Sequence, residues 1–257
     1  MITTRRSKLC LATRRQVHLI LCAFMAILPQ AASASSGQEQ VILLHGLCRS
    51  SRSMEPMARV LTNAGYKVWN IDYPSRTASV EQLSESAVGR AVANCESSGA
   101  TRINFVTHSM GGILVRHYLK HHPTPLPVRV VMLAPPNQGS EIVDKLGGWW
   151  LFKKINGPAG NELGTDQNSV PSRLGPANFP VGVIAGTRSI NWINSLLIPG
   201  RDDGKVSVER TRLRGMADWI AIPATHPFIM RNKTAMAETV AFLRSGKFDH
   251  SLPGTSS

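Results

Sequence analysis

Acidic residues are scarce in this chain of 257 amino acids, which has 29 lysines and arginines, 16 aspartates and glutamates, and a formal net charge of +13. Aromatic residues are also few, at 6%. The basic residues are scattered and have no interleaved aromatics, whereas nucleic-acid-binding proteins cluster basic side chains along one surface. We therefore expect no nucleic-acid partner. The excess positive charge is compatible with peripheral contact with an anionic membrane or envelope surface.

Internal repeats and long hydrophobic runs are missing as well. The apolar run 17–28 is too short for a comfortable membrane span. It follows five basic residues and precedes Ala32-Ser33-Ala34, which matches the small-x-small pattern at which secretory signals are cleaved. The sequence thus predicts a signal peptide over 1–34, cleavage near Ala34, and a secreted or periplasmic protein with one domain over 35–257. The alternative is an N-terminal anchor that is retained.

Only four cysteines are present, and two of them, Cys10 and Cys22, would leave with the signal peptide. We place Cys48 in a loop at the C-terminal edge of the first expected strand. Cys95 ends a helix that runs back toward the opposite edge, over roughly 20 Å at 1.5 Å per residue. Because bridged cysteines need Cα atoms within about 7 Å, the sequence predicts two free thiols.

Short apolar runs alternate with segments of helical periodicity along most of the chain. The expected strands are 41–44, 66–71, 103–107, 128–133, 181–185 and 219–222, and the expected helices are 53–63, 80–95, 113–119 and 234–243. Continuous apolar strands of this kind are buried on both faces. The alternation predicts an α/β protein with a mostly parallel central sheet and helices on both faces.

The alternation breaks down between Pro135 and Pro180, where Gly, Pro and Asn surround isolated apolar pieces that include Trp149 and Trp150. A loop region this long inside a compact domain is usually functional. We expect 137–180 to form a short lid-like insertion or a substrate wall over the candidate nucleophile. The alternative is a surface excursion whose tryptophans fill the core.

The most informative stretch is 107–112, Thr-His-Ser-Met-Gly-Gly, because it lies between an expected strand and an expected helix. A serine at such a sharp turn is exposed at the edge of the sheet, and small neighbours let strand and helix approach. Ser109 is therefore the candidate nucleophile. Thr107 departs from the usual G-x-S-x-G pattern, because its β-branched side chain takes the place of the first glycine.

A serine hydroxyl is a poor nucleophile until a base takes its proton and an acid orients that base. When the serine occupies a strand-to-helix turn of this kind, the acid and then the histidine follow it in the chain. His226 follows the last expected strand directly, whereas His250 lies in a polar tail. We therefore prefer His226 as the base.

The candidate acids are Asp202 and Asp203, which follow the expected strand 181–185 after a connecting segment. Asp203 is preferred because Gly204 beside it permits a tight turn that aims the carboxylate inward. An oxyanion hole needs two N–H donors. We expect them at Met110, one residue past the nucleophile, and at Leu47, in the loop after the first strand.

Several motifs together resemble the α/β-hydrolase superfamily, specifically small bacterial lipases and esterases. They are His45-Gly46-Leu47, the 107–112 turn, Asp203-Gly204-Lys205-Val206 and Thr225-His226. The stretch 136–140 is also similar to the Pro-His-x-Gly-Ser segment of lipases, with Asn137 in place of the histidine. The resemblance implies a Ser109, Asp203 and His226 triad, with Leu47 and Met110 as oxyanion donors.

The expected function is a secreted or periplasmic serine hydrolase that cleaves small-molecule or lipid carboxylic esters through an acyl-enzyme. The resemblance implies no metal and no organic cofactor, and we expect a monomer. Because the same triad serves esters, thioesters and amides, an acyltransferase or amidase is one alternative. A non-catalytic lipid-binding protein on the same scaffold is another, and lipid association without turnover would distinguish it.

Overall fold

The strands of this protein form one parallel sheet. The computed structural model describes residues 38–252 and 254–256, so the expected signal peptide lies outside the described residues. Within them the strands are β1 (Glu39–Leu44), β2 (Lys67–Ile71), β3 (Arg102–His108), β4 (Val128–Leu133), β5 (Val181–Gly186) and β6 (Asp218–Ile222). Their order is β2-β1-β3-β4-β5-β6, and every adjacent pair is parallel. The predicted α/β fold class is confirmed.

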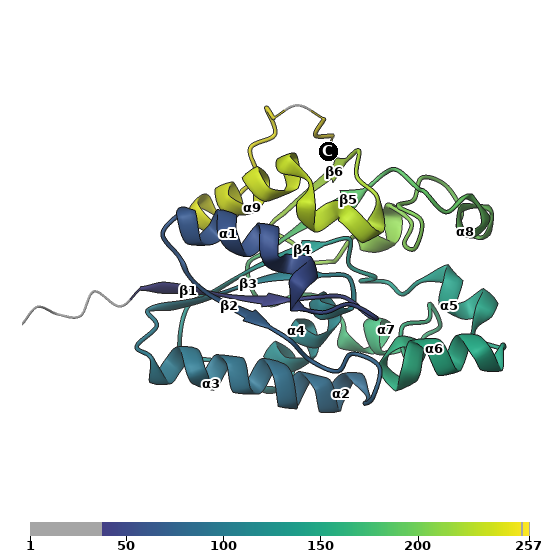
Figure 1. The fold of residues 1–257 in the computed structure, drawn as a ribbon, viewed down its shortest axis with the longest axis horizontal. Coiled ribbons are helices and arrows are strands. Elements are labelled where there is room, and N and C mark those ends of the chain that lie inside the picture. Colours follow the sequence, from purple (N-terminus) through teal and green to yellow (C-terminus); the bar gives the residue numbers. More distant parts are fainter. Residues whose placement is uncertain (1–37, 253, 257) are drawn as a thin grey trace, which may run out of the picture. The chain divides into compact units, whose positions relative to one another are not determined.

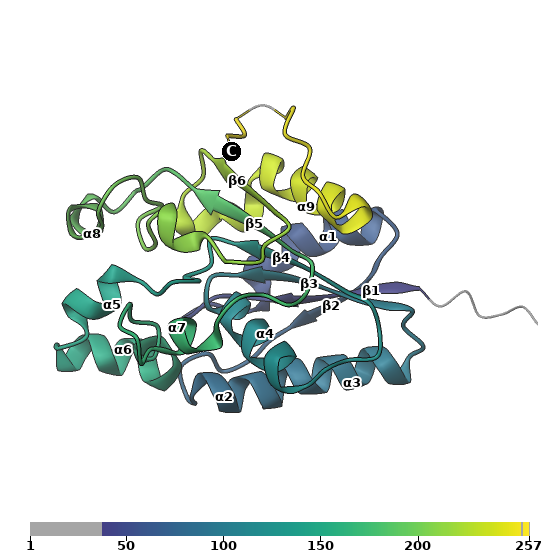
Figure 2. The same ribbon diagram turned by 180° about the vertical axis from the view of Figure 1, so that it is seen from behind.

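Helices cover both faces of the sheet (Figures 1 and 2). On one face lie α1 (Glu55–Asn63) and α9 (Lys233–Ser245), and on the other lie α2 (Val80–Leu83), α3 (Arg90–Ser97) and α4 (Met110–His121). Two hydrophobic cores result, one on each face. Because a strand such as β5 is buried on both sides, its sequence is a continuous apolar run without alternation.

The expected helix 80–95 is interrupted by a π-helical turn over Ser84–Gly89. The Ser84 side chain is buried there and donates to the Leu114 carbonyl of α4 at 3.2 Å. An extra residue in one helical turn is a known form of helix irregularity. The element therefore continues in the same direction as α2, η2 (Ser84–Gly89) and α3 instead of forming one uniform α-helix.

The segment 137–180 contains helices, so its interpretation as a long loop is wrong. The helices are α5 (Glu141–Leu146), α6 (Trp150–Asn161) and α7 (Val170–Leu174). Gly157 breaks α6 with a φ of 68°, and a Cβ there would lie 2.0 Å from the Arg76 carbonyl oxygen. Glycine is thus required by both conformation and contact, and its presence concealed the helix in the sequence.

The tryptophans of this segment do not fill the core. Trp149 is 68% exposed and Trp150 is 73% exposed, which excludes the core-filling alternative. They lie at the start of α6, at the end of the sheet toward which the strands point (Figure 1). Their environment is therefore the surface, beyond the C-terminal edge of the sheet.

The base of the segment is fixed by the buried guanidinium of Arg116, in α4. It donates to the carbonyl oxygens of Asn137 at 2.9 Å, Pro171 at 3.2 Å and Gly175 at 2.8 Å. Burial lowers its pKa to about 10. Because unpaired buried donors are costly, these carbonyls tie α4 to the chain on both sides of α5 and α6. Asn137 thus has a structural role at this position.

The remaining short elements are η1 (Ser51–Met54), α8 (Trp192–Leu197), η3 (Glu209–Thr211) and η4 (His226–Arg231). Cys48, which is exposed, and Cys95, which is buried, are both free thiols. Across residues 38–252 and 254–256, no helix combines the length and the apolar character needed to cross a bilayer.

Candidate active site

Ser109 occupies a strained turn between β3 and α4. Its φ is 52° and its ψ is −123°, a combination that L-residues rarely adopt and that costs about 1–3 kcal/mol. The Ser109 N–H donates to the Leu133 carbonyl of β4 at 2.9 Å, which holds the turn against the neighbouring strand. The side chain is thereby presented at the C-terminal edge of the sheet, at the start of α4.

The close approach of α4 to the sheet occurs at Gly111 and not at Thr107. A Cβ at Gly111 would lie 2.9 Å from the Leu44 carbonyl oxygen and 3.0 Å from that of His45. Thr107 is fully buried, and its Oγ1 would lie 3.2 Å from a Cβ at Gly112. Thr107 therefore fits because the glycine opposite it has no side chain.

We expect Gly111→Ala to destabilise the fold, because its new methyl group would press on backbone carbonyls that cannot move aside. The expected loss is about 1–3 kcal/mol in the free energy of unfolding, measured by urea denaturation. Gly148→Ala is the matched control, since a Cβ there meets nothing within 4 Å, and its effect should stay within about 0.5 kcal/mol. Equal effects of the two substitutions would contradict the packing described for the turn.

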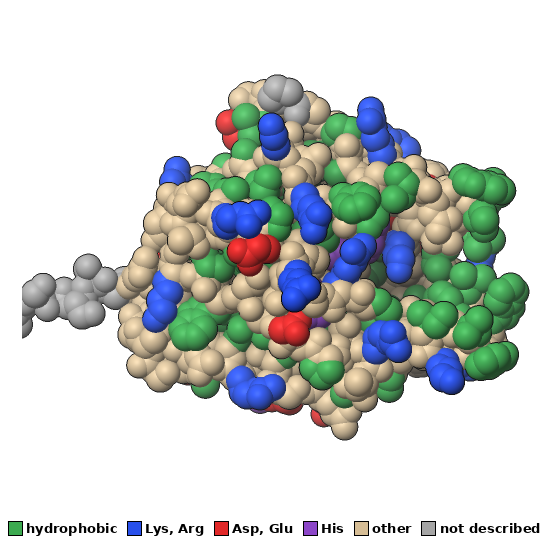
Figure 3. Space-filling view, in the orientation of Figure 1, with side chains coloured by type: hydrophobic (Ala, Val, Ile, Leu, Met, Phe, Trp, Pro, Cys, Tyr) green, Lys and Arg blue, Asp and Glu red, His purple; other side chains and the backbone are tan. Residues whose placement is uncertain are grey.

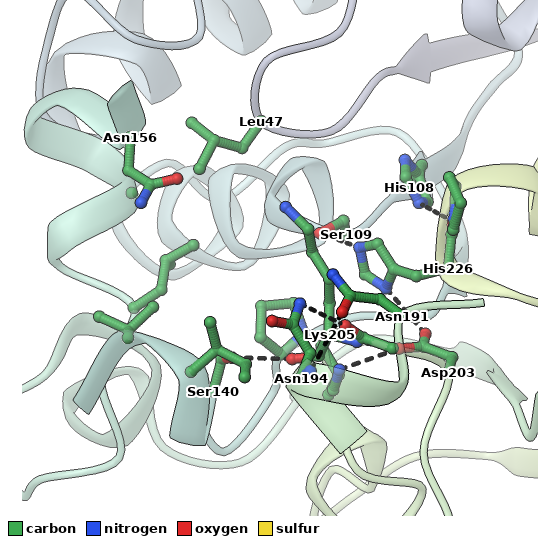
Figure 4. Close-up of a pocket in the computed structure, with 18 of the residues that line it drawn as sticks. Leu47, His108, Ser109, Ser140, Asn156, Asn191, Asn194, Asp203, Lys205 and His226 are labelled. Carbon is green, nitrogen blue, oxygen red and sulfur yellow. Dashed lines mark hydrogen bonds and ion pairs between the residues drawn. The ribbon is translucent and has the colours of Figure 1, made fainter. Parts of the chain in front are cut away.

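A hydrogen-bonded row connects Ser109, His226 and Asp203 (Figure 4). The His226 Nδ1–H donates to Asp203 Oδ2 at 2.7 Å, because a carboxylate can only accept. In the neutral ring Nε2 then carries no proton and accepts the Ser109 hydroxyl, with Oγ at 3.0 Å. Asp203 is 1% exposed and His226 5% exposed, so water competes little for these bonds.

Asp203 is the carboxylate that reaches the histidine, as the sequence predicted over Asp202. Its other oxygen, Oδ1, accepts the backbone N–H groups of Lys205 at 3.0 Å and Val206 at 2.9 Å. The backbone N–H of His226 also donates to the backbone carbonyl of Asp203 at 2.9 Å. These bonds fix both loops relative to each other and hold the carboxylate facing the imidazole.

Asp202 faces the other way and supports α8. Its Oδ1 accepts the Ser195 hydroxyl at 2.8 Å and the Gly204 N–H at 2.7 Å. His250, the second candidate base, also lies elsewhere, because its Nε2 is 3.0 Å from Asp218 Oδ1 at the start of β6. The structure thus brings together the preferred histidine and the preferred aspartate, whereas the two rejected candidates bond to other groups.

His108 supports His226 from behind. Its Nε2–H donates to the His226 carbonyl at 2.9 Å, and the two rings lie 4.9 Å apart. Burial lowers the pKa of His108 well below 6.5, and the positive charge that His226, Arg49 and Lys205 can carry lowers it further. His108 is therefore a neutral packing partner and leaves His226 as the histidine that faces the serine.

His45 supports the loop that carries Leu47. Its ring stacks on Tyr73 at 4.1 Å, and the Tyr73 hydroxyl donates to the His45 carbonyl at 2.5 Å. Burial lowers the His45 pKa from 6.5. Leu47 lies in this loop and lines the cavity beside Ser109. Met110 follows Ser109 as the first residue of α4, where a backbone N–H has no acceptor within its own helix.

A cavity of about 230 Å³ opens beside Ser109 and His226. Its wall is mainly apolar, and residues of the segment 137–180 contribute to it, which agrees with an expected substrate wall; movement as a lid stays a prediction. The apolar wall residues are Leu47, Pro136, Ile142, Val143, Phe152, Leu163, Ile190, Val206 and Pro227. Trp149 and Trp150 are not among the lining residues.

Polar wall residues include several that sequence reasoning missed. Lys205 reaches into the cavity from the Asp203 loop, and Asn191 and Asn194 approach from α8 (Figure 4). Ser140 donates to the Lys205 carbonyl at 2.8 Å. Lys205 was detectable, because it lies two residues after the candidate acid. The asparagines had no sequence signal, since only folding brings α8 to the cavity.

A family model described as the alpha/beta hydrolase family matches residues 41–252 of this chain. The chain belongs to the alpha/beta hydrolase family. The match spans β1 through the segment after α9 and includes Ser109, Asp203 and His226. In the described residues this alpha/beta hydrolase has six parallel strands and a serine at the strained turn after β3.

Solved structures of lipases and phospholipases share the fold at low identity. The mature Bacillus licheniformis lipase BlEst2 has a TM-score of 0.64 and 19% identity, over 82% of this chain and 93% of that chain. Phospholipase PlaB from Legionella pneumophila has a TM-score of 0.59 and 18% identity, over 82% of this chain and 57% of that chain. Aspergillus fumigatus lipase B has a TM-score of 0.60 and 16% identity, over 80% of this chain and 52% of that chain. At these identities, the likenesses support the fold of this alpha/beta hydrolase and nothing beyond it.

Proposed function

We propose that this alpha/beta hydrolase is a secreted or periplasmic carboxylic-ester hydrolase that works through an acyl-enzyme at Ser109. The observation that carries the proposal is the buried row in which His226 accepts the Ser109 hydroxyl and donates to Asp203. Export is supported by the signal-peptide pattern over 1–34. The lipase and phospholipase structures that share the fold are compatible with an ester substrate.

Each residue has one role in the proposed reaction. Ser109 Oγ attacks the ester carbonyl carbon while His226 Nε2 takes its proton, and Asp203 stabilises the imidazolium that forms. The N–H groups of Leu47 and Met110 bind the oxyanion. His226 then protonates the departing alcohol, which leaves the acyl group on Ser109. A water molecule, deprotonated by His226, attacks the acyl carbon and releases the acid and the free serine.

The cavity points to a short or medium acyl chain. Its volume of about 230 Å³ lies below the roughly 300–1,000 Å³ of pockets that enclose drug-sized ligands. Its wall is apolar near Phe152, Leu163 and Val206, which suits a hydrocarbon chain. Arg49 and Lys205 also line the cavity and supply positive charge there, beside the apolar wall.

Hydrolysis of a p-nitrophenyl ester series from acetate to palmitate tests this proposal. We expect turnover with its maximum at short or medium chains, because a long chain exceeds the cavity. Added alcohols distinguish the alternative chemistry, since accumulation of transfer products at the expense of free acid would identify an acyltransferase. An absence of turnover on every ester, together with no covalent labelling of Ser109 by a fluorophosphonate, would contradict the proposal and favour a non-catalytic lipid-binding protein.

A further inference from the structure

Large hydrophobic side chains are exposed in one region of the described surface. The structure gives nine of them within residues 38–252 and 254–256, and all belong to the start of α6, to α8 and its approach, or to η4. We call them the apolar rim: Trp149, Trp150, Leu151, Ile155, Ile190, Trp192, Ile193, Leu196 and Phe228. Figure 3 shows hydrophobic side chains gathered at the end of the molecule that carries α5, α6 and α8 in Figure 1.

The two halves of the rim are held in place by polar contacts. In α8, Asn194 donates to the Gly204 carbonyl at 2.9 Å and Ser195 donates to Asp202 at 2.8 Å, while none of its residues is buried. Its anchors are thus polar, and Trp192 and Leu196 are 71% and 76% exposed. A short helix that exposes its apolar side chains and bonds through its polar ones is suited to an apolar partner.

The α6 half is anchored at its C-terminal part. Gly157 lies against the Arg76 carbonyl, and the Ala159 N–H donates to the Ala78 carbonyl at 3.1 Å. The residues before Gly157 include Trp150, Leu151 and Ile155, which are exposed. This half of the rim therefore projects from a fixed base.

The segments that carry the rim border the cavity that contains Ser109. Phe152 and Asn156 of α6 line the cavity, as do Ile190 before α8 and Pro227 beside Phe228. An object that covers the rim therefore faces the cavity opening. The rim therefore lies beside the candidate active site and not on a remote surface.

The segments that carry the rim have charges of one sign, and the exposed Asp144 of the neighbouring helix α5 accepts the Thr165 N–H and hydroxyl. The segments 149–161, 188–201 and 226–231 contain no aspartate or glutamate, and they carry Lys153, Lys154, Arg188, Arg201 and Arg231. The acids that follow two of these segments are engaged, because Glu162 accepts the Val80 N–H at 2.8 Å and Asp202 accepts Ser195. Exposed aromatic and aliphatic side chains flanked by lysine and arginine are the composition of surfaces that enter an anionic lipid interface.

We propose that the apolar rim docks this protein on the surface of a lipid bilayer that contains anionic lipids. A second copy of the chain is a poorer occupant, because pairing two rims would bring together segments that carry Lys153, Lys154 and Arg188 and contain no acidic residue. The proposal deepens the proposed function, since docking would place the cavity that contains Ser109 at the lipid surface. Docking itself requires no turnover, so it can be measured separately.

Vesicle flotation with the Ser109→Ala protein tests the docking without lipid hydrolysis. We expect binding to vesicles of phosphatidylcholine mixed with phosphatidylglycerol, at least about tenfold tighter than to phosphatidylcholine alone. In the same background, Trp150→Ser/Trp192→Ser should weaken binding at least about tenfold, because two side chains that enter the interface are lost. Lys153→Glu/Lys154→Glu should weaken it by a similar factor, whereas Arg59→Glu/Arg90→Glu, on exposed helix positions away from the rim, should have a much smaller effect.

Two controls separate this proposal from the others. With Ser109 intact, Trp150→Ser/Trp192→Ser should hydrolyse a short soluble ester at the original rate, because neither residue lines the cavity. If the protein failed to bind vesicles but still hydrolysed the soluble ester, the docking proposal would be overturned and the proposed hydrolase function would stand. Light scattering that shows a dimer, and a monomer after the tryptophan substitutions, would assign the rim to a second copy and overturn the lipid surface. Equal binding by the rim and control variants would also overturn it.

Discussion

Ser109→Ala is expected to lower p-nitrophenyl butyrate turnover by about 10³–10⁶-fold, the range over which loss of a triad serine acts. The size of the effect follows from the geometry, because Ser109 Oγ is the hydroxyl that lies 3.0 Å from His226 Nε2. The protein should remain folded, since alanine has the same Cβ at the strained turn and removes only the oxygen. Steady-state kinetics and circular dichroism measure the two properties.

Ser140→Ala is the matched control for that substitution. Ser140 lines the same cavity, but its hydroxyl donates to the Lys205 carbonyl at 2.8 Å and does not meet His226. The expected change in turnover is within about tenfold, as for the loss of one supporting hydrogen bond. If the two alanine variants lost activity to the same extent, Ser109 would have no special part in the chemistry.

Asp203→Asn is expected to lower turnover by about 10⁴-fold, because an uncharged amide neither stabilises the imidazolium nor enforces the tautomer that leaves Nε2 free. The two backbone N–H groups of Lys205 and Val206 that bond Oδ1 would hold the substituted side chain in the same place. The loss should therefore appear mainly in kcat, with the fold preserved. Denaturation in urea checks the second point.

Asp202→Asn provides a neighbouring control of identical chemistry. An asparagine oxygen can still accept the Ser195 hydroxyl and the Gly204 N–H, and neither bond involves His226. Turnover should stay within about tenfold of the original. A larger loss of turnover from Asp202→Asn than from Asp203→Asn would show that the proposed mechanism names the wrong aspartate as the acid.

The fold could be predicted because its strands are buried on both faces. Burial makes β5 a continuous apolar run and leaves mostly apolar stretches at 103–106 in β3 and 130–133 in β4, so the predicted positions of these strands agree with the structure to within one or two residues. Helices α6, α7 and α8 were not predicted. Helices α7 and α8 are short and α6 is broken at Gly157, and all three are held by distant groups, such as Arg116, Gly204 and the Arg76 carbonyl, that no local pattern reveals.

The candidate site also has features that the sequence predicted and features that it did not. Ser109, Asp203 and His226 each follow a strand, and parallel strands bring their C-terminal ends to one edge, so chain order alone predicts that they meet. The choice between Asp202 and Asp203 depended on Gly204 alone, and the structure shows that only the Asp203 carboxylate bonds to His226, whereas Asp202 accepts the Gly204 N–H. The exposed tryptophans were noticed in the sequence, but their exposure depends on how α6 is anchored.

The most direct test of the proposed nucleophile is mass spectrometry of the protein after reaction with a fluorophosphonate. The geometry predicts one covalent adduct per chain, located on the peptide that contains Ser109, and much slower labelling of Asp203→Asn. This result would show that the hydroxyl beside His226 is activated before any substrate chemistry. Absence of an adduct, or an adduct on another serine, would contradict the account of the site.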